Sequence, residues 1–141
     1  MSALWIPVRV YLEDTDAQGV VYNASYFRFM ERARTDWLRA RGIDHREVGQ
    51  DYGLAFVLTA IEARFAAPGR LGDMLAVSAE LGKLKGARAV FAQQIRRGGE
   101  SGELLAEGQA QVACVDVASG RARRWPRDIL ERLIHETDID E

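Results

Sequence analysis

The sequence predicts an α+β domain in which one long helix packs against a mostly antiparallel sheet. Residues 22–38 carry apolar side chains at spacings of three and four, which is the period of a helix, whereas the chain after Gly53 alternates apolar and polar residues as strands do. Consecutive strands favour antiparallel pairing, and the apolar stripe of the helix needs the sheet as its partner. The 141 residues are enough for one domain with a sizeable core.

The first predicted elements are a strand and the long helix. Val8 to Leu12 is rich in β-branched and aromatic residues, so it predicts a strand. Asn23 is a plausible N-cap of the helix, and Gly42 supplies a left-handed stop. The residues of the apolar stripe are Tyr22, Tyr26, Phe29, Met30, Ala33, Trp37 and Leu38. A second, short helix is expected to begin at Asp44.

Four strands are expected after the helices, over residues 57–65, 75–81, 87–96 and 103–117. Glycines in the segments between them predict turns. Residues 121–125 predict either a last edge strand or an extended exit. Pro126 suits the first turn of a C-terminal helix that runs to Ile134, and residues 136–141 are expected to fray.

Composition excludes several classes of protein. The 19 basic and 21 acidic residues give a net charge of −2, which does not indicate a nucleic-acid partner. No apolar run reaches the length of a membrane span, and the N-terminus lacks the pattern of a signal peptide, so a cytoplasmic location is the expectation. Cys114 is the one cysteine, and two histidines accompany it, so neither a disulfide nor a Cys/His metal cluster is expected.

The segment from Glu13 to Gly19 places three acids before the helix and allows three interpretations. A calcium loop starting at Asp14 is disfavoured, because its twelfth position is Ser25 and not glutamate. Acids before a helix are also favourable simply through the helix dipole. Alternatively, one carboxylate attacks or activates water while the N–H groups of the helix stabilise oxyanion charge. Spacing alone leaves the last two interpretations open.

The segment Val8-Arg-Val-Tyr-Leu-Glu-Asp-Thr-Asp-Ala-Gln-Gly-Val-Val-Tyr-Asn-Ala-Ser-Tyr-Phe-Arg-Phe-Met-Glu-Arg-Ala-Arg34 closely resembles hotdog-fold acyl-CoA thioesterases of the 4-hydroxybenzoyl-CoA thioesterase-like group, especially the bacterial branch associated with the Tol-Pal system. The resemblance continues through Ala67-Pro-Gly-Arg-Leu-Gly-Asp-Met-Leu75, Lys85-Gly-Ala-Arg88 and Arg124-Trp-Pro126. It implies a long central α-helix wrapped by a five- or six-stranded antiparallel β-sheet. It also implies a homodimer that often forms a tetramer, and no cofactor, since coenzyme A is part of the substrate.

The resemblance also implies roles for individual residues. Asp16 matches the catalytic acid, acting as base or nucleophile, and the Tyr22 N–H matches the donor to the thioester carbonyl. Asn23 stands where the Tol-Pal branch commonly has histidine, and asparagine cannot shuttle a proton near neutral pH. Basic residues in the corresponding strand and turn meet the phosphates of coenzyme A. These substrate-binding candidates are Lys83, Lys85 and Arg88, of which strand alternation places Arg88 on the opposite face from the two lysines unless Gly86 marks a bulge.

Two alternative functions belong to classes of protein other than enzymes. The first is a hotdog protein that binds acyl-CoA or an acyl carrier protein without efficient turnover. The second is an interaction protein that uses the arginine-rich segment 121–127, although a solvated surface explains four arginines more simply. A serine hydrolase is excluded, because the chain has no Gly-x-Ser-x-Gly elbow.

Overall fold

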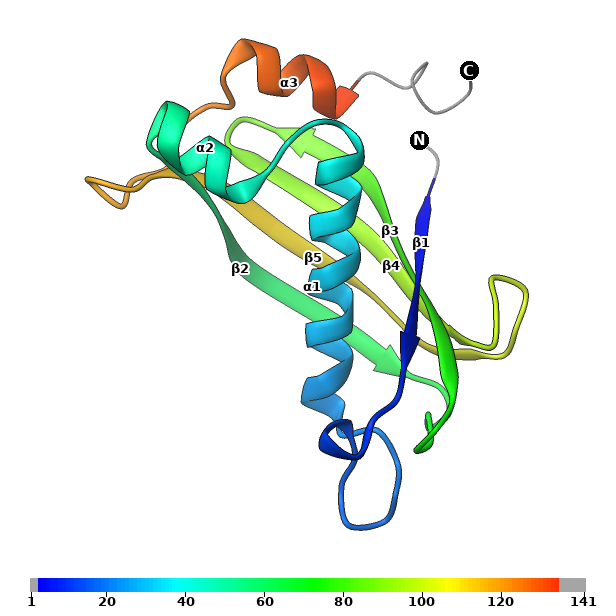
Figure 1. The fold of residues 1–141 in the computed structure, drawn as a ribbon. Helices are drawn as coiled ribbons and strands as arrows, with labels where there is room; N and C mark the ends of the chain where they lie inside the picture. The colour runs from blue at the N-terminus through cyan, green and yellow to red at the C-terminus, as the bar shows by residue number, and fades with distance from the viewer. Residues whose placement is uncertain (1–2, 135–141) are drawn as a thin grey trace.

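A computed structural model describes residues 3–134, in which one long helix lies along one face of an antiparallel sheet (Figure 1). The strands are β1 (Leu4–Arg9), β2 (Leu54–Phe65), β3 (Met74–Lys85), β4 (Arg88–Arg97) and β5 (Leu104–Asp116), and their order in the sheet is β1-β3-β4-β5-β2. The helices are α1 (Asn23–Ala40), α2 (His45–Tyr52) and α3 (Arg127–Ile134), with a short 3-10 turn at Leu12–Asp14. The predicted α+β class and five-stranded antiparallel sheet are confirmed, and the predicted frayed tail lies outside the described residues.

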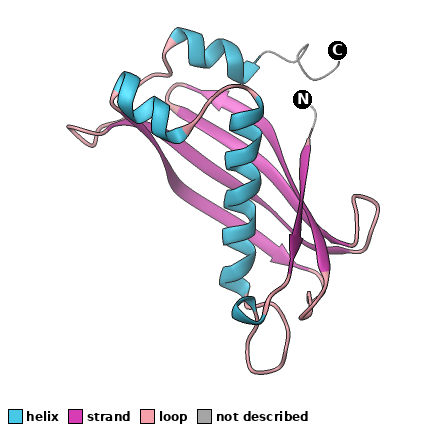
Figure 2. Cartoon of the chain, viewed as in Figure 1, coloured by secondary structure: helices cyan, strands magenta, loops and turns pink. Residues whose placement is uncertain are grey.

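Helix α1 packs its apolar stripe against the sheet, as the sequence predicted. Phe29, Ala33 and Trp37 are completely buried, and the Trp37 ring meets the Phe91 ring of β4 edge to face, with 5.2 Å between the ring centroids. Helices α2 and α3 lie near the C-terminal end of α1 (Figure 2). The N-terminal end of α1 therefore stays open toward the loops at the other end of the sheet.

The predicted N-cap of α1 is wrong by one residue. Tyr22 is the N-cap, in an extended conformation and without a side-chain cap, and Asn23 is the first helical residue, with its side chain exposed. At α2 the prediction is confirmed, because the Asp44 carboxylate accepts hydrogen bonds from the N–H groups of Arg46 and Glu47. At α1 the sequence signal failed because Asp14, nine residues earlier than Asn23, accepts the Tyr22 N–H and organises the helix start.

Two strand boundaries also differ from the prediction. Strand β1 ends at Arg9, and Leu12 lies in the 3-10 turn instead of the strand, because the Asp14 carboxylate accepts the Tyr11 N–H and its own N–H donates to Tyr11. Residues 121–125 form only an isolated bridge between Ala122 and Val115, so they are an extended exit and not a further strand. Cys114 is a buried core residue, and burial raises the pKa of its thiol, as expected of a packing residue.

Candidate active site

The acidic loop, residues 13–22, folds around Asp16. The Asp16 N–H donates to the Val20 carbonyl at 2.9 Å, and the Asp16 carbonyl accepts the Gly19 N–H at 3.1 Å, a turn for which Gly19 adopts a φ of +78°. Asp16 Oδ1 accepts the Gln18 N–H at 2.8 Å. Among the described residues no group hydrogen-bonds to Oδ2 of this exposed side chain. One oxygen is thus fixed by the turn, and the other is open to a ligand.

Asp14 has a different environment from Asp16. Its carboxylate is buried and accepts the Tyr11 N–H at 2.8 Å and a guanidinium N–H of Arg28 at 3.0 Å. Its backbone carbonyl accepts the Ser25 hydroxyl at 3.1 Å. The contacts with Arg28 and Ser25 join the acidic loop to the start of α1. Asp14 therefore supports the loop that Asp16 exposes.

The N-terminus of α1 presents N–H groups next to Asp16. The first N–H groups of any α-helix have no acceptor within the helix. The Tyr22 N–H donates to the Asp14 carbonyl at 2.9 Å, which contradicts the expectation that it is open, and the Ser25 N–H donates to the Tyr22 carbonyl at 2.8 Å. Among the described residues the N–H groups of Asn23 and Ala24 are left without an acceptor, and of these two residues Asn23 is the one that lines the cavity beside Asp16.

Asp16 and Asn23 line the same cavity, whose volume is about 460 Å³. The other residues that line it are mostly apolar and come from the acidic loop, from α1 and from the end of β2: Val20, Val21, Tyr22, Tyr26, Phe65, Ala66, Ala67 and Pro68. A carboxylate, a helix N-terminus and an apolar wall meet in this one hollow. Such a combination suits an apolar acyl group whose carbonyl must be polarised.

The aromatic wall of this cavity was not predicted from the sequence. The Tyr26 ring lies 5.5 Å from that of Phe65, centroid to centroid, and the Tyr26 hydroxyl accepts the Gly69 N–H at 2.9 Å. Burial raises the pKa of Tyr26, so this hydroxyl stays protonated at neutral pH. The signal available in the sequence was the Pro68-Gly69 pair, which marks a turn but not its contact with the helix.

In a single copy of the chain, the three basic candidates lie far in space from Asp16. Lys85 and Arg88 are direct cross-strand partners, so they share one face of the sheet. Lys83 lies two residues before Lys85 in β3 and therefore lies on the same face. The predicted opposite-face placement of Arg88 is wrong, because the chain reverses in a two-residue turn at Gly86 and Ala87 and brings Arg88 directly opposite Lys85. The register shift of this hairpin lies between Leu81 and Lys83 and not at Gly86. Arg88 pairs with Ala113 of β5, whereas Phe65, which lines the cavity beside Asp16, pairs with Ala106 of the same strand. Ala106 and Ala113 are seven residues apart, which corresponds to roughly 23 Å along the strand.

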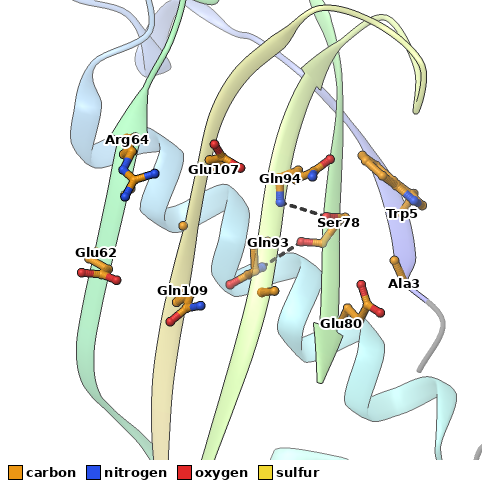
Figure 3. A pocket seen from close by; sticks show the side chains of 13 residues that line it. Ala3, Trp5, Glu62, Arg64, Ser78, Glu80, Gln93, Gln94, Glu107 and Gln109 are labelled. Atoms are coloured by element: carbon orange, nitrogen blue, oxygen red, sulfur yellow. Dashed lines mark hydrogen bonds between the residues drawn. The ribbon is translucent and has the colours of Figure 1, made fainter. Parts of the chain in front are cut away.

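A second hollow, of about 560 Å³, lies on the face of the sheet away from α1 (Figure 3). Its lining includes Trp5, the carboxylates of Glu62 and Glu107, and the amides of Gln94 and Gln109. A third, of about 680 Å³, runs between α1 and β1 and contains side chains of both charges. Neither of these two hollows is lined by Asp16 or by the first residue of α1, in contrast to the cavity beside Asp16.

Two further properties hold for residues 3–134. They contain no group of three or more His, Cys, Asp or Glu side chains placed to hold a metal ion. Within the same range, no helix combines the length and the apolar composition that crossing a membrane requires.

Comparison with known proteins agrees with this geometry. A model of the thioesterase-like superfamily matches residues 10–133. The chain belongs to this superfamily. The acyl-CoA thioester hydrolase YbgC of Escherichia coli O157:H7 is 41% identical, with 88% of the chain and 90% of the relative covered, and the acyl-CoA thioesterase YbgC of Haemophilus influenzae is 36% identical, with 92% and 93% covered.

The hotdog fold is confirmed by solved structures. The 1,4-dihydroxy-2-naphthoyl-CoA thioesterase Slr0204 from Synechocystis superposes with a TM-score of 0.86, with 99% of each chain covered at 24% identity. At that identity the likeness concerns the fold. The long helix and the antiparallel sheet are thus the fold of the thioesterase-like superfamily, and the roles of individual residues depend on the geometry of the site.

Proposed function

We propose that this protein hydrolyses the thioester of an acyl-CoA to a free acid and coenzyme A. The observation that carries the proposal is the cavity in which the Asp16 carboxylate and the N-terminus of α1 face an apolar wall. The names of the YbgC relatives support this substrate class. The proposed chemistry uses a side chain and backbone groups alone, without a cofactor, and we propose a cytoplasmic location.

In the proposed reaction the acyl group lies against the wall formed by Tyr26 and Phe65. Oδ2 of Asp16 takes a proton from water as the water oxygen attacks the thioester carbon, or attacks that carbon itself to give a mixed anhydride that water then opens. The Asn23 N–H and the dipole of α1 stabilise the oxyanion. The carbon–sulfur bond then breaks, and coenzyme A leaves as a thiolate, a good leaving group that needs little help from an acid.

Thiol release tests this function. Purified protein is incubated with a panel from acetyl-CoA through long-chain acyl-CoA to aromatic acyl-CoA esters, and free coenzyme A is measured with a thiol reagent. Turnover of at least one class is expected. If the protein binds these esters without releasing thiol, hydrolysis is refuted, and the non-hydrolytic binding of acyl-CoA or an acyl carrier protein takes its place.

We also propose that two copies of the chain pair through β2 and complete each site. Strand β2 is an edge of the sheet and exposes Val57 (42%), Leu58 (44%) and Phe65 (43%), which is unfavourable for an isolated edge strand. Antiparallel pairing of two β2 strands about a two-fold axis would reverse the second sheet. The end of the partner's sheet that carries Lys85 and Arg88 would then approach the Asp16 end of the first.

Substitution of the edge strand tests this pairing. Val57→Arg places a charge in the proposed interface, so we expect a monomer in sedimentation velocity and a fall in thiol release of at least about tenfold, because the site would lose its second half. The control is Ala3→Arg, directly before β1 at the opposite edge of the sheet, which is expected to leave the dimer intact. A dimer that survives Val57→Arg would contradict the proposed interface.

A further inference from the structure

We propose that Arg97, the last residue of β4, is a positioning residue for the reaction, because it fixes the loop of residues 68–73 against the acidic loop that carries Asp16. The inference rests on the proposed thioesterase function. Arg97 does not line the cavity beside Asp16, and its side chain is 30% exposed. Its effect on the reaction must therefore be transmitted through the residues that it contacts.

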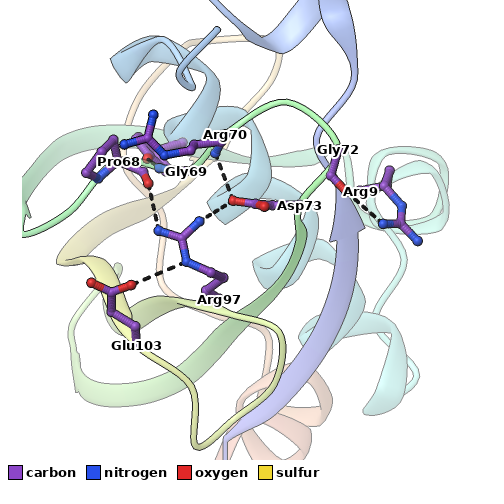
Figure 4. A network of polar contacts seen from close by, with 9 residues as sticks. Arg9, Pro68, Gly69, Arg70, Gly72, Asp73, Arg97 and Glu103 are labelled. Atoms are coloured by element: carbon purple, nitrogen blue, oxygen red, sulfur yellow. Dashed lines mark hydrogen bonds and ion pairs between the residues drawn. The ribbon is translucent and has the colours of Figure 1, made fainter.

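The guanidinium of Arg97 holds both ends of the 68–73 loop (Figure 4). One terminal nitrogen donates to the carboxylate of Asp73, and the other donates to the Pro68 carbonyl at 2.9 Å. The Nε donates to Glu103 at 3.3 Å. Asp73 also accepts the Arg70 N–H at 2.9 Å within the loop. The planar, forked guanidinium can satisfy several acceptors in different directions, which a single lysine ammonium on a flexible stem does less well.

The 68–73 loop in turn holds the acidic loop through backbone hydrogen bonds. The Val21 N–H donates to the Gly69 carbonyl at 2.8 Å, and the Leu71 N–H donates to the Gly19 carbonyl at 3.0 Å. Val20 and Arg70 form an antiparallel bridge between the same two segments. Since Val20 also accepts the Asp16 N–H, these contacts reach the turn that presents the carboxylate.

The fit between the two loops leaves little room for displacement. A side-chain carbon added at Gly69 would lie 3.0 Å from a methyl group of Val21 and 3.3 Å from the Tyr26 hydroxyl. Pro68, whose carbonyl Arg97 holds, also lines the cavity. A shift of the 68–73 loop would thus move both the wall of the cavity and the turn at Asp16.

Kinetics of Arg97→Ala and Arg97→Lys test the proposal, with Arg96→Ala as the matched control. Arg96 is the preceding residue of β4, has the same charge, and donates to Gln94 and to the Gly102 carbonyl, acceptors that belong to neither loop. We expect kcat to fall about 10- to 100-fold in Arg97→Ala with little change in KM, because displacement of a reacting group by about 1 Å has effects of this size. Arg97→Lys should recover part of the loss, and Arg96→Ala should keep the wild-type kcat.

Amide hydrogen exchange provides a second readout that does not depend on turnover. In the absence of substrate, the amides of Val21 and Leu71 should exchange faster in Arg97→Ala than in wild type, while Arg96→Ala should match wild type. Equal kcat in the two alanine variants, or unchanged exchange in Arg97→Ala, would overturn the positioning role. If wild type itself releases no thiol, the thioesterase function fails, and the exchange rates still decide whether Arg97 fixes the loops.

Discussion

Asp16→Asn should lower kcat for thioester hydrolysis by about 10²- to 10⁴-fold, the range expected when a general base is removed. Asparagine is nearly isosteric and keeps a side-chain oxygen that can accept the Gln18 N–H, the bond that orients the wild-type carboxylate. The amide has no basic oxygen to take the proton of water. KM and thermal stability should therefore change little, and the loss should be confined to the chemical step.

Glu13→Gln is the matched control for Asp16→Asn. Glu13 is an exposed acid of the same loop and does not line the cavity beside Asp16, so the control removes one negative charge from the loop and leaves the cavity intact. Asp14 is unsuitable for this purpose, because its buried carboxylate braces the loop through Tyr11 and Arg28. Thiol release by Asp16→Asn at more than about one third of the wild-type rate would eliminate Asp16 as base or nucleophile, since that rate lies far above the expected range.

The elements of the fold were predictable because their signals are local. The stripe that ends at Trp37 and Leu38 has a helical period, and the glycine-containing turns separate the strands, so type and order follow from the sequence. The errors occur where distant residues act on the backbone. Asp14 determines the start of α1 through a hydrogen bond to Tyr22, which no capping pattern around Asn23 could indicate.

The candidate site was predictable in part for the same reason. Asp16 and the start of α1 are neighbours in sequence, so a carboxylate beside a helix N-terminus could be expected from that one segment. Phe65 and Pro68 join them only through the pairing of β2 with β5 and the return of the chain to Tyr26. Which backbone N–H is open was also unpredictable, because it depends on the acceptor that Asp14 supplies to Tyr22.

A buried polar network between α1 and the sheet determines the second large effect that we expect. Arg34 of α1 is 7% exposed, and its guanidinium donates to the Gln93 side-chain oxygen at 2.9 Å. The Gln93 amide nitrogen donates to the carbonyls of Met30 and Ser78, at 2.9 and 3.0 Å (Figure 3 shows the bond to Ser78). Burial lowers the pKa of Arg34, with Glu31 acting in the opposite direction, yet a guanidinium remains charged at neutral pH.

Gln93→Leu should lower the free energy of unfolding by about 3 kcal/mol, because it leaves a buried guanidinium without this acceptor and two carbonyls without this donor. Urea unfolding measures the change. Gln94→Leu is the control: Gln94 is the next residue of β4, is only half-buried, and accepts one hydrogen bond from Arg96, so about 1 kcal/mol or less is expected.

The double variant Arg34→Met/Gln93→Leu separates the cost of the unpaired charge from the loss of packing. Apolar replacement of both partners removes the buried charge together with its acceptor, and such replacements are often neutral or stabilising. The loss of unfolding free energy in the double variant should therefore be smaller, by about 1 to 3 kcal/mol, than the sum of the losses in Arg34→Met and Gln93→Leu. Additive changes would show that Arg34 finds water when Gln93 is removed, and that its charge is not confined by the helix and the sheet.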